Sequence, residues 1–213
     1  MSTPRQVITS TKRPTESMST NGAVATNGHP HPKHHHIWLV TGPAGCGKST
    51  VAKHVADSLN MPYIEGDEFH PPANIEKMSN GIPLTDADRW DWLTRLREEA
   101  LKQLDLGNEG VVVTCSALKR KYRDVIRVAP YFSPGLQLHF IYLHAPEEVL
   151  LRRVAQRKGH YMGEQMVHSQ FAILEPPTAE ERDVISLDVS GSIGEVSQDA
   201  LDQVVRKLAE DAA

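Results

Sequence analysis

The residues of this chain best suited to chemistry form the run Gly42-Pro43-Ala44-Gly45-Cys46-Gly47-Lys48-Ser49. The run fits the pattern G-x-x-x-x-G-K-[ST], in which backbone N–H groups surround the phosphates of a nucleotide. Glycines permit this close approach, and the helix that follows adds partial positive charge. Lys48 is expected to reach the β- and γ-phosphates, and Ser49 to bind Mg²⁺. We therefore predict a nucleotide site made of this run and Thr50, with Lys48 also acting in catalysis.

Other interpretations of the glycine-rich run are weaker. A chance turn would not be flanked by an apolar run on one side and helical spacing on the other. Cys46 has no general-base partner in the sequence that would make it a nucleophile, so we interpret it as a small loop residue. The glycines do not fit the dinucleotide pattern G-x-G-x-x-G, and no guanine-reading motif of regulatory GTPases is present. ATP and Mg²⁺ are therefore the expected cofactors.

A second group of polar residues begins at Gly66-Asp67-Glu68-Phe69-His70. It follows an expected strand, and open parallel sheets bind ligands beyond the carboxyl ends of their strands. The carboxylate of Asp67 is suited to orienting an acceptor hydroxyl, taking its proton or binding Mg²⁺ through water. The alternative is that Asp67 caps a helix. We expect Asp86 and Asp88 to be helix caps and leave them out of the chemistry.

These residues must be positioned by alternating strands and helices. Apolar runs predict strands at 37–40, 63–67, 111–114, 138–143 and 184–189. Helical spacing of apolar residues predicts helices at 49–59, 92–104, 147–155 and 196–208. Such alternation indicates an α/β fold in which a parallel sheet is covered on both faces.

The chain has 213 residues, which fits one domain, preceded by a polar segment. Residues 1–34 have few large apolar side chains, so we predict a disordered tail there and a folded domain at 35–213. We interpret the histidines near the end of this tail as part of a polar linker rather than as a metal site. Residues 1–36 carry a formal charge of +3, which leaves −7 for the rest. This acidic body argues against binding to nucleic acid.

Cysteine content and hydropathy suggest a compartment. Only two cysteines are present, too few for a disulfide framework, which favours a reducing, cytoplasmic setting. No apolar stretch is long enough to span a membrane, so no membrane partner is expected. The Ser/Thr-rich N-terminus with its basic residues leaves a matrix-targeting sequence open.

Four ordered blocks of the sequence resemble the thermoresistant-type gluconokinases. The first reads G-D-x-x-H-P…N…K-M…G-x-P-L-x-D-x-D-R-x-x-W-L over residues 66–93. The others are Cys115–Lys119 with Tyr122–Asp124, the lid-like segment with Arg153, Arg157, Gly159, His160 and Met162, and Ser169–Phe171 with Leu174–Pro176. The resemblance covers residues 37 to about 190. Tyr161 stands where Phe is common, and the first 36 residues have no counterpart in compact members.

The resemblance implies that the chain transfers phosphate from ATP to D-gluconate and forms 6-phospho-D-gluconate. It also implies a three-layer P-loop kinase fold of the nucleoside-monophosphate-kinase type, with a five-stranded parallel sheet and a mobile helical lid. Similar enzymes are often homodimers. Two alternatives are a kinase for another small acceptor, such as shikimate or a nucleoside monophosphate, and a nucleotide-binding regulator without turnover.

The resemblance also suggests roles for single residues. Asp67 would orient or deprotonate the 6-hydroxyl and help Ser49 to bind the metal. The expected gluconate-binding residues are Asp67, His70, Lys77, Arg89, Ser116, Arg123, His160 and Gln170. Either Arg89 or Arg123 would pair with the substrate carboxylate through two hydrogen bonds. Arg153 and Arg157, four residues apart on one helix face, would offset charge on the transferring phosphate as catalytic residues.

Overall fold

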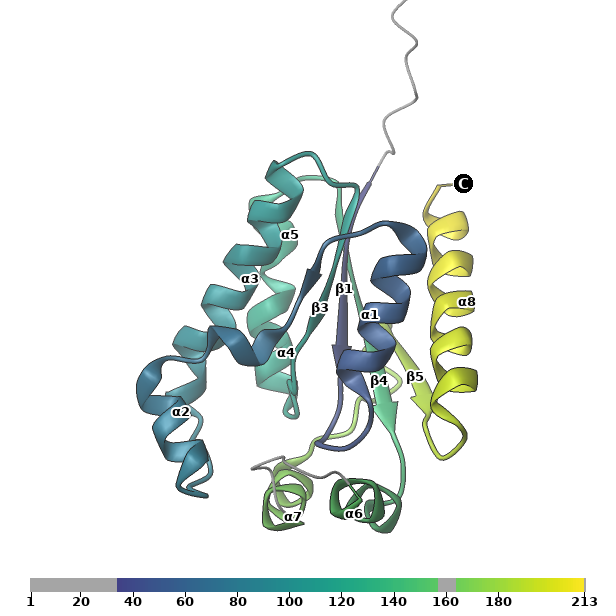
Figure 1. The fold of residues 1–213 in the computed structure, drawn as a ribbon. Coiled ribbons are helices and arrows are strands. Elements are labelled where there is room, and N and C mark those ends of the chain that lie inside the picture. Colours follow the sequence, from purple (N-terminus) through teal and green to yellow (C-terminus); the bar gives the residue numbers. More distant parts are fainter. Residues whose placement is uncertain (1–33, 157–163, 213) are drawn as a thin grey trace, which may run out of the picture. The chain divides into compact units, whose positions relative to one another are not determined.

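Five parallel strands form one sheet at the centre of the molecule (Figure 1). The computed structural model describes residues 34–156 and 164–212. The strands are β1 (His35–Thr41), β2 (Tyr63–Ile64), β3 (Gly110–Thr114), β4 (Leu136–His144) and β5 (Val184–Asp188). Their order across the sheet is β2-β3-β1-β4-β5. The expected five-stranded parallel sheet is confirmed, and β1 with its phosphate loop lies at its centre.

Helices cover both faces of the sheet (Figure 1). On one face, α1 (Lys48–Leu59) and α8 (Ile193–Asp211) pack on Trp38 and Val40 of β1. On the other face, α3 (Trp90–Asp105), α4 (Arg120–Arg127) and α5 (Ala129–Phe132) pack on Ile37 and Leu39. Alternate residues of a strand point to opposite faces, so an unbroken apolar run supplies both cores.

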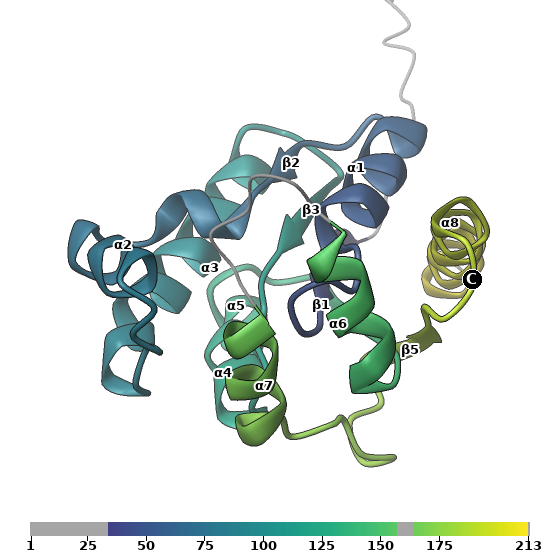
Figure 2. The same ribbon diagram turned by 60° about the horizontal axis from the view of Figure 1, so that its bottom comes forward.

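The remaining elements surround the carboxyl ends of the strands. They are α2 (Pro72–Ser79), α6 (Glu147–Ala155), α7 (Glu164–Ile173) and the 3₁₀ turns η1 (Gly66–Phe69) and η2 (Ala87–Arg89). Figure 2 looks toward this edge, with α6 and α7 in front and α2 on the side away from α8. In the sequence α6 and α7 flank the expected lid, of which residues 157–163 lie outside the described part of the chain.

Two local expectations are wrong. The strand predicted at 63–67 ends at Ile64, and Asp67 lies in the turn η1 instead. Asp86 and Asp88 do not cap a helix with their side chains. Asp86 accepts hydrogen bonds from Lys119, Lys121 and Tyr122, and Asp88 from Lys77 and Thr85. Both carboxylates therefore tie neighbouring segments together.

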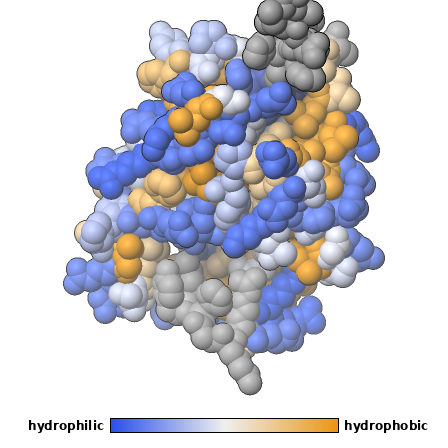
Figure 3. All heavy atoms as spheres, turned by 45° about the horizontal axis from the view of Figure 1, so that its top comes forward, coloured by the Kyte–Doolittle hydropathy of each residue, from blue (hydrophilic) through white to orange (hydrophobic). Residues whose placement is uncertain are grey.

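Neither the helices nor the visible surface has the character of a membrane-spanning protein in the part described here. Within residues 34–156 and 164–212, no helix combines the length and apolar character needed to cross a membrane. Hydrophilic side chains cover most of the face seen in Figure 3, with smaller hydrophobic patches between them.

Candidate active site

The glycine-rich loop between β1 and α1 has a backbone that only glycine adopts readily. Gly42, Gly45 and Gly47 have positive φ angles of 142°, 83° and 94°. A Cβ at Gly42 would lie 2.3 Å from the backbone oxygen of Leu143. The loop is therefore pressed against β4 and leads directly into the start of α1, where a helix N-terminus favours anions.

Lys48 and the hydroxyl residues stand at the mouth of this loop. The Nζ of Lys48 donates to the backbone oxygens of Gly42 at 3.0 Å and Pro43 at 3.1 Å, so the ammonium is curled over the loop. Ser49 and Thr50 line the cavity in front of it. Cys46 is fully buried, as expected for a small residue of the loop rather than an exposed nucleophile.

A cavity of about 460 Å³ joins the phosphate loop to the second polar group. Its walls carry the predicted residues Lys48, Ser49, Thr50, Asp67, His70, Arg89, Ser116 and Gln170. These side chains come from five separate segments, which only the folded sheet brings together. A volume of this size suits a small ligand.

Asp67 faces this cavity because its backbone is tightly anchored. A Cβ on Gly66 would lie 1.9 Å from the backbone oxygen of Thr114, and Trp92 Nε1 donates to the oxygen of Gly66 at 2.7 Å. The Asp67 side chain remains 54% exposed. Partial burial raises its pKa above the ordinary value, the charge of Lys48 works against that rise, and Glu65 adds to it.

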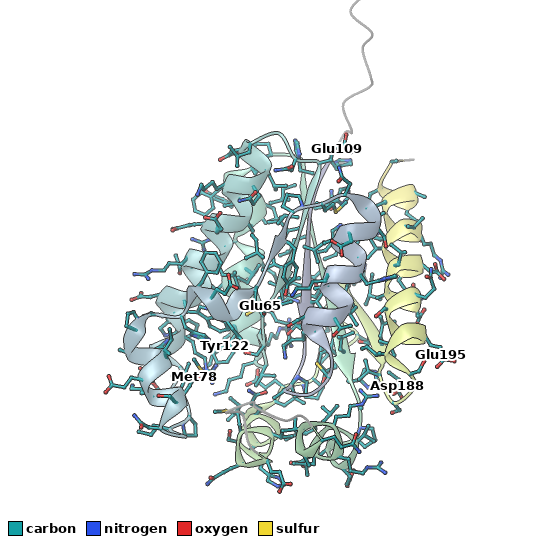
Figure 4. The ribbon with its side chains drawn as sticks, viewed as in Figure 1. Glu65, Met78, Glu109, Tyr122, Asp188 and Glu195 are labelled. Carbon is teal, nitrogen blue, oxygen red and sulfur yellow. The ribbon has the colours of Figure 1, made fainter. Side chains whose placement is uncertain are left out.

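Glu65 is a cavity residue that the sequence analysis missed. Its carboxylate accepts hydrogen bonds from the Tyr63 hydroxyl and, at 2.5 Å, from Thr114 Oγ1. Burial raises its pKa, but hydrogen bonds from Thr114, Tyr63 and Ser49 outweigh burial and leave the pKa below its ordinary value. Figure 4 shows Glu65 where β2 ends. Its position two residues before Asp67 was the available signal.

His70 and Arg89 form the buried side of the cavity. His70 stacks on Trp92 with ring centroids 4.0 Å apart, and its Nε2 lies 4.0 Å from Asp67 Oδ1. Burial and the charge of Arg89 lower the pKa of His70 to about 4, so its imidazole is neutral at pH 7. Arg89 donates to the backbone oxygen of Leu84 at 3.2 Å. In the described structure, His70 Nδ1 and Arg89 Nε have no hydrogen-bond partner although both are buried.

Gln170 connects α7 to the phosphate loop. Its Oε1 accepts a hydrogen bond from the backbone N–H of Ala44 at 2.7 Å. Gln170 therefore lies in the cavity as predicted, but its carbonyl is directed at the loop. Ser116 enters the cavity from the segment after β3, and its backbone oxygen accepts a bond from Thr41 at 2.7 Å.

Other predicted site residues lie elsewhere. Arg123 is 1% exposed and forms two hydrogen bonds with Glu181, of 2.7 and 2.8 Å, so it does not reach the cavity. Lys77 pairs with Asp88 at 2.6 Å, outside the cavity wall. Arg157 and His160 fall outside the described residues.

Arg153 faces a different hollow from the one expected. Its guanidinium donates to the backbone oxygens of Val189 at 2.5 Å and Gly191 at 2.9 Å. With Gln156 and the segment 191–193 it lines a second cavity, which shares Gly45, Gly47 and Thr50 with the first. Arg153 does not line the cavity that contains Asp67, and its expected contact with the transferring phosphate stays a prediction.

A central glycine-rich phosphate loop, the strand order and the polar cavity beyond the strands define a P-loop phosphotransferase. Comparisons with known proteins are more specific. Residues 37–177 match the family model described as "AAA domain". A probable gluconokinase of Schizosaccharomyces pombe is 49% identical over 174 residues, which is 81% of this chain and 89% of that protein.

Two further relatives agree with that match. The thermoresistant gluconokinase of Escherichia coli is 42% identical over 155 residues, covering 73% of this chain and 85% of its own length. The crystal structure of a gluconokinase from Sinorhizobium meliloti has a TM-score of 0.72 and 41% identity, covering 84% of this chain and 95% of that one. The chain belongs to the gluconokinase family.

Proposed function

We propose that the chain transfers the γ-phosphoryl group of ATP to the 6-hydroxyl of D-gluconate. The observation that carries this proposal is the single cavity in which Lys48 and Ser49 of the phosphate loop face Asp67, His70 and Arg89. A phosphate donor and a hydroxylated acid held on these two walls are in position for direct transfer. The family of the chain supports gluconate as that acid.

The nucleoside end of ATP fits the second cavity. That hollow shares Gly45, Gly47 and Thr50 with the phosphate loop and continues toward Arg153 and Ile193. A nucleotide lying over the loop would place its phosphates toward Asp67 and its base beside Arg153, whose flat guanidinium is suited to stacking. Arg153 would then hold the nucleotide rather than stabilise the transferring group.

Mg²⁺ fits the residues around Ser49. The Ser49 hydroxyl lies near the ionised carboxylate of Glu65, whose pKa it helps to lower, and Asp67 faces the same cavity. Oxygen ligands of this kind are what Mg²⁺ prefers, usually with several waters and phosphate oxygens. When bound with the nucleotide, the ion neutralises negative charge on the phosphates.

Asp67 would accept the proton of the attacking hydroxyl. Its raised pKa makes it a better base than an ordinary carboxylate, and the charge of Lys48 favours its ionised form. Neutral His70, next to Asp67, would hydrogen-bond the sugar hydroxyls. Arg89, whose buried Nε lacks a partner within residues 34–156 and 164–212, would bind the substrate carboxylate.

The proposal is tested by measuring ADP release with gluconate, other sugar acids, shikimate and nucleoside monophosphates. We expect turnover with gluconate to exceed that with each other acceptor, and Asp67→Asn to lower kcat by orders of magnitude. If turnover is faster with another acceptor, that acceptor and not gluconate is the substrate of the enzyme. ATP binding without turnover on any acceptor would favour the nucleotide-binding regulator.

A further inference from the structure

Two imidazoles and a carboxylate meet at the end of the sheet opposite the active site. His36 lies near the start of β1, His139 lies on β4, and Asp211 is the last residue of α8. Figure 1 shows this end of α8 beside the amino end of β1. His36 is 6% exposed and His139 4% exposed. Both lie on the face of the sheet that α8 covers, so the three side chains form one buried group.

The spacing of their polar atoms suits a metal ion. His36 Nδ1 lies 3.4 Å from His139 Nε2, and Asp211 Oδ2 lies 3.2 Å from His139 Nε2 and 3.8 Å from His36 Nδ1. A tetrahedral zinc ion with bonds of about 2.0–2.1 Å separates its ligand atoms by about 3.3 Å. Two of the three separations match this value and the third, 3.8 Å, is longer, so the three atoms approximate the face of a coordination tetrahedron.

The hydrogen bonding of Asp211 Oδ2 is incomplete. Within the described part of the chain, Asp211 Oδ2 is buried and has no well-formed hydrogen bond. The other oxygen, Oδ1, is paired with Lys207 at 3.1 Å, which brings one positive charge near the group. For Oδ2, the nearest partner is His139 Nε2 at 3.2 Å, in a geometry short of a well-formed hydrogen bond. A buried carboxylate oxygen without a well-formed hydrogen bond is unfavourable. A cation between Oδ2 and the two imidazoles would satisfy it.

The surroundings favour neutral, fixed imidazoles. Trp38 is fully buried and stacks on His139 with ring centroids 4.3 Å apart and on His36 at 5.8 Å. Burial lowers the pKa of His139 to about 4 against the opposing charge of Asp211, and burial also lowers the pKa of His36. Neutral imidazole is the form that binds a metal, and a packed apolar shell holds such ligands in place.

We propose that His36, His139 and Asp211 form a site for a divalent transition metal, with zinc as the best match and water completing the coordination. Two imidazoles and one carboxylate are ligands that zinc accepts, and three protein ligands plus water is a common arrangement. The ion would join the end of α8 to the two central strands. The site is independent of phosphate transfer and would stabilise the fold.

The test must separate this group from the other histidines near the N-terminus. The background is the full chain in which His29, His31, His34 and His35 are replaced by Asn, stripped of metal with a chelator. We expect it to bind one zinc per chain in calorimetry and to gain several degrees in Tm when zinc is added. Cobalt in place of zinc should give the visible absorption bands of tetrahedral coordination. If this background protein does not bind zinc, the proposal is overturned.

Substitutions of the proposed zinc ligands provide a second test. On the same background, Asp211→Asn and His139→Gln should each weaken zinc binding at least tenfold and abolish the zinc-dependent rise in Tm. Asp199→Asn, an exposed substitution on the same helix, should leave both unchanged. Unchanged zinc binding in Asp211→Asn would overturn the proposal, because the three side chains would then form a hydrogen-bonded group and not a metal site. If His139→Gln fails to fold, the isosteric Asp211→Asn and the cobalt spectrum decide.

Discussion

At the scale of single residues, burial and pairing decide which basic side chains are free to bind an anion. Arg123 has Glu181 and the backbone oxygens of Ala117 and Glu175 as partners, so its donors are already used. Among the residues that the structure describes, Arg89 donates to the backbone oxygen of Leu84, and its buried Nε has no partner. A buried donor of this kind gains most from an incoming carboxylate.

Arg89→Lys should therefore raise the KM for gluconate at least tenfold, with the KM for ATP nearly unchanged. Lysine keeps the charge but cannot form the paired hydrogen bonds of a guanidinium with a carboxylate. Steady-state kinetics with each substrate varied in turn would measure this split. Arg95→Lys, an exposed substitution on α3, is the matched control. An unchanged KM for gluconate in Arg89→Lys would remove this residue from the substrate site.

Glu65→Gln should lower kcat at least a hundredfold and raise the Mg²⁺ concentration needed for half-maximal activity. The carboxylate is ionised and hydrogen-bonded to Ser49, and an amide is a poorer ligand environment for a hard cation. Magnesium titrations at saturating ATP and gluconate would measure both effects. Exposed Glu68→Gln is the control from the same turn. Equal magnesium dependence of both variants would contradict a metal-site role for Glu65.

At the scale of elements, sequence pattern predicted the strands and long helices but not the short helices around the site. The buried strands are unbroken apolar runs, and α3 repeats Trp92, Leu96 and Ala100 on one face, which are strong local signals. By contrast, α2 buries only Asn74 and Met78, so it carries almost no apolar period. Its position is set by contacts with distant residues, which local spacing does not encode.

The residues of the candidate site also divide into those with a local sequence signal and those whose role depends on distant contacts. Lys48 and Asp67 were recognisable because each belongs to a motif with its own local geometry. Arg123 was assigned to the substrate from the family resemblance, and nothing local indicated its actual partner, Glu181, which is 58 residues away. Glu65 was missed because its role depends on Thr114, 49 residues along the chain.

Gly66→Ala tests how the turn η1 is held against β3. The added Cβ would lie 1.9 Å from the backbone oxygen of Thr114, so the turn carrying Asp67 must shift. We expect a loss of about 1–3 kcal/mol in the free energy of unfolding and a fall in kcat of at least tenfold. Urea unfolding and steady-state kinetics measure the two effects. Gly194→Ala, a helical glycine with nothing within 4 Å of its Cβ position, should cost neither stability nor activity.

At the scale of the whole molecule, one buried ion-pair network joins the site to the far strand. Arg123 of α4 and Arg127 both bond Glu181, and Arg127 also bonds Asp183, which precedes β5. Arg123 further holds the backbone of Ala117, next to Ser116 of the cavity. The network therefore fixes the loop after β3 and the segment between α7 and β5 in one arrangement.

Glu181→Gln should remove about 3–5 kcal/mol from the free energy of unfolding at pH 7, because it leaves buried Arg123 without its counter-charge. Hydrogen bonds from Arg123 lead the causes that lower the pKa of Glu181 from 4.5 to about 2. A lowered folded-state pKa gives stability that is complete above pH 4.5 and is lost as the pH falls toward 2. The difference between the original chain and Glu181→Gln should shrink across that range. Urea unfolding from pH 2 to 7 measures it, with the exposed Glu180→Gln as control. A difference that stays constant with pH would mean that Glu181 is not the group whose ionisation stabilises the fold.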